Sequence, residues 1–295
     1  MKKLLKSNKL IKAFFLVALV SATFLAGVLY AKVDVLGKGE ISGKSDKLVD
    51  KEKVVPEKGF DLPISFGSLG PKLIEAGVID KEKFIQTVNL NSGEIAILTE
   101  GTDKPININA DNSQFVVDML WAIGLAQKSN AYTNGPMGTD YKKDVANFSS
   151  TAGWTLSKTK AVDYLGKFEL FNLTEEQQKR VEEIAKNIYR PCCGNSTWFP
   201  DCNHGMAALA AIEMMVAQNM SDSDIYKSVL KLNSFWFSGT YLTTAQYFAD
   251  QGISWDKIDA KKVLGSEFSS SQGAAQILKK VEPQEGNGGG AGCGA

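Results

Sequence analysis

An uncharged, apolar run near the N-terminus divides this chain into a segment suited to a membrane and a longer part that must fold in water. Nineteen residues, from Ala13 to Ala31, carry no charge, and they follow five lysines at Lys2, Lys3, Lys6, Lys9 and Lys12. As a helix this run would be about 28 Å long, close to the thickness of the hydrocarbon core of a bilayer. We therefore expect residues 1–32 to form a signal anchor, which is a single transmembrane helix.

The charges around this run predict its orientation. An excess of lysine on the N-terminal flank favours that end inside a bacterial cell and the bulk of the chain outside the cytoplasmic membrane. Cleavage after Ala31 would place Leu29 where signal peptidase prefers a small residue, so we favour an uncleaved anchor. Release as a secreted or periplasmic protein is the alternative. Residues 33–59 are rich in charged residues, glycine and serine, which is typical of a flexible tether.

Charge balance and cysteine number narrow the class of protein. Lysine plus arginine and aspartate plus glutamate each number 33, so the chain has no net charge to attract nucleic acid. The expected compartment permits disulfides, but four cysteines are too few for a disulfide-built scaffold. The cysteines are therefore more useful as indicators of a site than of the fold.

Residues 60–160 are predicted to form an α+β subdomain. Apolar spacing predicts two short helices, over 71–76 and 81–86. The stretches 94–99 and 105–109 alternate apolar with polar residues and flank a Gly-Thr-Asp turn, which predicts a small β-hairpin.

A helix that begins with Ser113 as its cap and a long loop over 129–158 complete this subdomain. Residues 161–282 are predicted to be a helical domain around a cysteine-rich loop, so the fold class is mainly α. Its expected helices span 174–190, 205–218, 221–237, 243–250 and 270–281. The last segment, 283–295, is a glycine-rich tail that carries Cys293, and we expect it to be disordered.

Three of the four cysteines and the only histidine crowd into thirteen residues. The segment reads Cys192-Cys193-Gly-Asn-Ser-Thr-Trp-Phe-Pro-Asp-Cys202-Asn-His204. Thiolates with a neutral imidazole form the ligand set of many zinc sites, and thiolates also select Cu(I). The prediction is a zinc or copper site with Cys192, Cys193, Cys202 and His204 as ligands.

Three further roles follow from position in the chain. Cys202 and His204 are expected at the first turn of the 205–218 helix, whose dipole favours a thiolate at Cys202. Asp201 is expected either to orient His204 or to cap that helix. Cys293 is expected to act as a mobile accessory thiol.

The run Ile188-Tyr-Arg190-Pro-Cys-Cys193-Gly-Asn-Ser-Thr197 resembles the redox domain of cytochrome c maturation protein H. In that family a helix ends in Arg-Cys-x-x-Cys-x-x-x-Ser, and the later Ser221-Asp222 and Phe235-Trp236-Phe237 also have counterparts. The resemblance covers about 175–238 and implies an extracytoplasmic three-helix bundle whose cysteines act on apocytochrome thiols. Because Cys192 and Cys193 are neighbours here, it implies that the disulfide partner of one of them is Cys202.

The sequence thus indicates three alternative functions. The first is a membrane-anchored, extracytoplasmic protein that binds zinc or copper, in metal handling or metalloprotein assembly, with a metalloprotein or apocytochrome as partner. The second is a thiol–disulfide oxidoreductase that uses Cys192, Cys193 and Cys202. The third is a non-catalytic interaction module with a structural disulfide. Whether the chain is an enzyme is left open.

Overall fold

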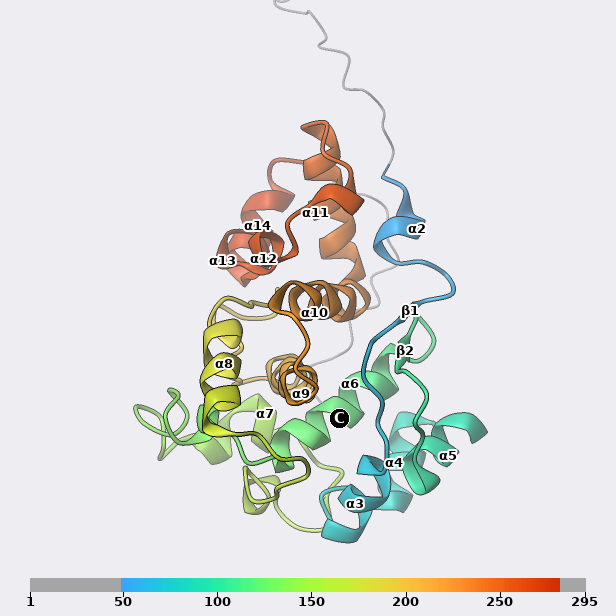
Figure 1. Cartoon of the computed structure of the whole chain (residues 1–295), viewed down its shortest axis with the longest axis vertical. Helices are drawn as coiled ribbons and strands as arrows, with labels where there is room; N and C mark the ends of the chain where they lie inside the picture. Colours follow the sequence, from blue (N-terminus) through green and yellow to red (C-terminus); the bar gives the residue numbers. More distant parts are fainter. Residues whose placement is uncertain (1–48, 282–295) are drawn as a thin grey trace, which may run out of the picture. The chain divides into compact units, whose positions relative to one another are not determined.

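The computed structural model describes residues 49–281, which belong to one compact unit (Figure 1). The predicted anchor, the first part of the tether and the tail with Cys293 lie outside these residues. Within the described part the chain is mainly helical, as predicted, and has a single two-stranded antiparallel sheet. No helix in 49–281 is long and apolar enough to span a membrane.

The end of the predicted tether belongs to the folded unit. Residues Lys51–Val54 form helix α2, which Asp50 caps with its side chain. Val54 and Val55 are both buried in the core. The prediction of a solvated tether up to residue 59 is therefore wrong for these last residues, because two adjacent valines give the segment an apolar surface to bury.

The small sheet is not the predicted hairpin. Strand β1 (Phe60–Asp61) pairs with β2 (Asn107–Ile108), with Phe60 opposite Ile108. The stretch predicted as the first hairpin strand lies in helix α5 (Ser92–Glu100). Asn91 and Glu94 form a capping box at the start of this helix, and that local bonding favours a helix over the strand suggested by the alternation.

The other predicted helices of the first half are present. They are α3 (Leu69–Ala76), α4 (Lys81–Val88) and the buried α6 (Ser113–Ala126). Asn112, and not Ser113, occupies the N-cap position of α6. The predicted loop 129–158 is mostly irregular, with short helical turns that include α7 (Ser149–Ala152).

The named elements of the second half are all helices. Its helices are α8 (Glu175–Ala185), α9 (Asn203–Ala217), α10 (Asp222–Trp236), α11 (Ser238–Asp250), α12 (Ala260–Leu264), α13 (Ser266–Ser269) and α14 (Ser271–Leu278). The helix predicted to begin at Thr174 is present as α8, and Thr174 and Gln177 form a capping box at its start. This helix ends at Ala185, five residues before the predicted end at Arg190, because the backbone of Ile188 and Tyr189 pairs with the cysteine segment instead.

Helix α9 is the centre of the core, and Figure 1 shows it among α6, α8 and α10. Nearly every residue of α9 is buried. It crosses α6 so closely that a Cβ on Gly124 would lie 2.3 Å from the carbonyl oxygen of Met206. Asn219, in the left-handed conformation with φ 56°, follows Gln218 at the C-cap of α9. The N-terminus of this fixed helix carries the candidate site.

Candidate metal centre

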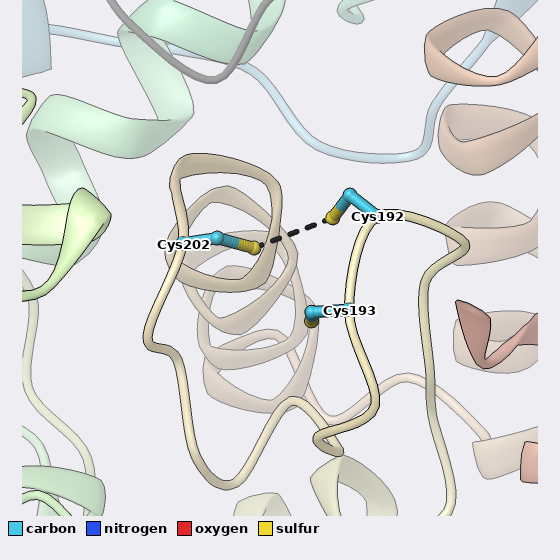
Figure 2. Close-up of side chains that lie close together, drawn as sticks. All are labelled: Cys192, Cys193 and Cys202. Carbon is cyan, nitrogen blue, oxygen red and sulfur yellow. Dashed lines mark hydrogen bonds between the residues drawn. The ribbon is translucent and has the colours of Figure 1, made fainter. Parts of the chain in front are cut away.

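Three thiols meet where the cysteine segment joins α9 (Figure 2). Cys192 and Cys193 lie in the loop after Pro191, and Cys202 stands at the N-cap of α9. Their sulfur atoms all lie within 4.8 Å of one another, so the group can hold a metal ion. Cys202 is only 6% exposed, whereas Cys192 and Cys193 are partly exposed.

The two neighbouring cysteines have different partners. The Cys192 sulfur lies 3.5 Å from the Cys202 sulfur, and Figure 2 shows these two sulfurs directed toward each other. The Cys193 thiol lies 3.9 Å from the Asp201 carboxylate. All three thiols are free of disulfides in this structure.

Backbone hydrogen bonds fix the loop that carries the first two thiols. The Thr197 N–H donates to the Ile188 carbonyl over 2.8 Å, and Tyr189 and Ser196 form an isolated antiparallel bridge. The Ser271 N–H, in the first residue of α14, donates to the Cys193 carbonyl over 2.9 Å. The first two interactions join the two sides of the loop to each other, and the third joins the loop to α14.

The buried side chain of Arg190 links several residues of the cysteine segment through hydrogen bonds. Its guanidinium is fully buried and donates from Nε to the Cys202 sulfur over 3.1 Å. Its other nitrogens donate to the Asp201 carboxylate (2.6 Å) and to the carbonyls of Asn195 and Phe199. Reasoning from sequence gave Arg190 no role in the site, although an arginine next to a cysteine pair and an aspartate next to Cys202 were visible signals.

Gly205 makes room for this arginine. A Cβ on Gly205 would lie 2.5 Å from Cζ and from one terminal nitrogen of Arg190. A glycine in the first turn of α9 is therefore required for Arg190 to reach Cys202. This dependence links the helix sequence to the shape of the loop.

Cys202 is where negative charge concentrates. Hydrogen bonds from Cys192 and Cys193 hold the pKa of the Cys202 thiol well below its usual range, and the Arg190 guanidinium lowers it further. The Gly205 N–H also donates to this sulfur, over 3.4 Å, as predicted for a cysteine at a helix N-terminus. The pKa of Cys192 is raised, chiefly by its hydrogen bonds to Cys193 and Cys202. The two shifts have opposite directions, so negative charge is favoured on the Cys202 sulfur over the Cys192 sulfur.

His204 stands apart from the three sulfurs. Its ring packs against Phe237, with ring centroids 4.5 Å apart, and against Trp236 at 5.6 Å. The ring is fully buried, and neither nitrogen has a hydrogen-bond partner among the described residues. Burial lowers the pKa of His204 to about 4, so the imidazole is neutral. It is not a member of the cysteine group that lies within 4.8 Å.

Asp201 has neither of its predicted roles. Its carboxylate accepts hydrogen bonds from Arg190 and from the Asn195 amide, and the ring nitrogens of His204 make no hydrogen bond to it. The N-cap of α9 is Cys202. Asp201 therefore supports the loop through its ion pair with the buried Arg190 guanidinium.

Comparison of the chain with protein families, with curated proteins and with solved structures gave no match. The resemblance to cytochrome c maturation protein H stays a prediction. Helices α8, α9 and α10 span the interval of that resemblance, but three packed helices are common to many unrelated proteins.

Proposed function

We propose that this chain binds one thiophilic metal ion, Zn(II) or Cu(I), through Cys192, Cys193 and Cys202. The observation that carries the proposal is the approach of three free sulfurs to within 4.8 Å of one another. Sulfurs bound to one zinc ion at about 2.3 Å lie about 3.8 Å apart, so only small shifts would be needed. Both zinc and Cu(I) accept such thiolate ligands.

The surroundings of the three thiols favour a metal-binding role over a purely structural role for these cysteines. The loop is held by Arg190, Asp201 and backbone bonds, so its thiols are ordered before an ion arrives. Cys192 and Cys193 remain partly exposed, which leaves a path for an ion from solvent. Ligands that are already in place reduce the entropy lost on binding.

A four-coordinate ion would need one more ligand. His204 was predicted for this position, and it would have to turn away from Phe237 to reach the sulfurs. Cys293 is a second candidate, since it lies twelve positions after Val281, a stretch that spans at most about 40 Å. Water at the exposed side is a third.

The cellular setting of the proposal comes from the sequence. A membrane-anchored domain outside the cytoplasmic membrane, with a partly open thiolate site, suits metal handling or metalloprotein assembly. The partner would be an extracytoplasmic metalloprotein or apocytochrome that exchanges the ion through its own soft ligands.

Elemental mass spectrometry with a parallel thiol count on the full-length, anaerobically purified chain tests this function. We expect one ion per chain and at least three thiols that become reactive only after chelation. Cys202→Ser should lose the ion. An ion retained at full stoichiometry in that variant would refute the ligand set.

Two matched variants identify the fourth ligand in the same experiment. His204→Leu replaces an unpartnered buried imidazole by an apolar side chain of similar size, so we expect a folded protein. If it keeps the ion, His204 is not a ligand. Cys293→Ser tests in the same way whether Cys293 is a ligand, and it leaves all described residues unchanged.

A further inference from the structure

The sulfurs of Cys192 and Cys202 contact each other directly and form the hydrogen-bonded pair drawn in Figure 2. Their 3.5 Å separation exceeds a disulfide bond of about 2.05 Å by only about 1.5 Å. Cys193 instead lies near Asp201, and a disulfide between the adjacent Cys192 and Cys193 would be strained. Among the three thiols, the geometry therefore favours one bridge.

The two members of this pair differ in access. Cys192 is partly exposed, so a reagent from solvent can reach it. Cys202 is 6% exposed, and two donors hold its sulfur, Arg190 Nε at 3.1 Å and Gly205 N–H at 3.4 Å. A buried, fixed sulfur beside an accessible one is the arrangement in which the accessible sulfur forms a mixed disulfide and the buried sulfur then resolves it.

We propose that Cys192 and Cys202 form a reversible disulfide, and that this bridge and the metal ion exclude each other. The bridge would remove two of the three ligands described above, leaving Cys193 as a free thiol. The half of this inference that concerns the ion rests on the proposed function. The half that concerns the bridge stands on the sulfur geometry alone.

The oxidation balances with a small-molecule disulfide as oxidant. The Cys192 sulfur, after losing its proton, attacks one sulfur of the reagent, forms a mixed disulfide and releases one reagent thiolate. The Cys202 sulfur then attacks the Cys192 sulfur and releases the second thiolate. Two electrons pass from the protein to the reagent, and the two protons of the protein thiols end on the two reagent thiols.

Oxidised glutathione added to the full-length, metal-free chain tests the bridge. We expect two of the four thiols to be lost, a Cys192–Cys202 link in peptide mapping, and recovery of all four thiols with a reductant. Cys193→Ser is the matched control and should still form the bridge, whereas Cys192→Ser should not. A Cys193–Cys202 link in the unaltered chain, or no intramolecular link at all, would overturn the inference.

The same oxidation of the ion-loaded chain tests the exclusion. With free ion at about 100 times Kd, about 1% of the sites are ion-free, so oxidation should slow roughly 100-fold. One ion should be released per bridge formed. An unchanged rate in a chain that binds the ion refutes the exclusion alone. A chain that forms the bridge but binds no ion instead refutes the proposed function and, with it, the exclusion, while the bridge stands.

Discussion

Arg190 shows how a single buried charge can organise a site. Four of its hydrogen-bond partners lie between Asn195 and Cys202, so the loop folds around the guanidinium. Removing it would leave the Asp201 carboxylate without its cation and the Cys202 sulfur without its charged donor. The loss of a buried arginine of this kind is costly, because it leaves the groups around it buried without their partner.

Gly205→Ala is predicted to destabilise the fold by about 1–3 kcal/mol, because the new methyl group would overlap the Arg190 guanidinium. Gly239→Ala is the matched control. It lies in α11, and nothing lies within 4 Å of its added Cβ. In a helix this second change should be neutral or stabilising. Urea denaturation of both variants checks the prediction, and equal unfolding free energies would refute the role given to Gly205.

Only part of the site could be predicted from sequence at this scale. The grouping of Cys192, Cys193 and Cys202 follows from their spacing and from the helix that begins after Cys202. The position of His204 does not, because it depends on how α9 packs against Trp236 and Phe237 at the end of α10. Such a contact between distant residues leaves no local pattern.

Among the elements, helices with side-chain caps were predictable. Thr174 with Gln177 and Ser221 with Asp224 mark the starts of α8 and α10 in the sequence as in the structure. The sheet was not predictable, because Phe60 pairs with Ile108, forty-eight positions away. The wrong hairpin came from reading the alternation in 94–99 without the Asn91–Glu94 capping box, which was present in the sequence.

The contact of α9 with its neighbours makes the stability of the fold depend on pH. Glu213 of α9 is fully buried, and burial raises its pKa from 4.5 to about 8. In the unfolded chain Glu213 ionises near pH 4.5, whereas in the folded chain it keeps its proton up to about pH 8. At Glu213, folding therefore takes up a proton in this window, and the contribution of Glu213 to the free energy of unfolding falls as pH rises from 4.5 to 8, by up to about 1.4 kcal/mol per pH unit.

Glu213→Gln is predicted to flatten this dependence, since the amide does not titrate. Asp118 of α6, whose pKa burial raises to about 7, adds a slope of the same sign and should persist in the variant. Glu75→Gln, at an exposed position of α3, is the control and should leave the slope unchanged. Free energies of unfolding measured between pH 5 and pH 8 test this prediction. If the free energy of unfolding changes with pH equally in Glu213→Gln and in the unaltered chain, the role given to Glu213 is wrong.

At the scale of the whole molecule, the described residues form one unit in which both halves share a core. Helix α6 of the first half packs on α9 of the second, and α2 contacts α11. The segments on either side of this unit carry the predicted anchor and Cys293, so the relation of the site to a membrane rests on sequence alone.

The predicted anchor can be tested by fractionation of bacterial cells that express the full chain. We expect the full chain in the membrane fraction after a carbonate wash, because about twenty apolar residues suffice to span a bilayer. Two charged residues placed in the run, Leu19→Lys and Leu25→Lys, should release it. Recovery of the unaltered chain in the soluble fraction would show that residues 13–31 do not act as an anchor.

The hydrogen-bond partners of the Arg190 side chain lie close to it in the sequence, and this bears on whether the site could be moved to another protein. All of them lie within the thirteen residues from Arg190 to Cys202, and the helix that follows contributes a glycine in its first turn. The segment thus carries most of its own polar scaffold. Recombination or protein engineering could therefore move this segment to the N-terminus of another buried helix. The recipient helix would need a glycine at the third position after the equivalent of Cys202, where Gly205 lies here.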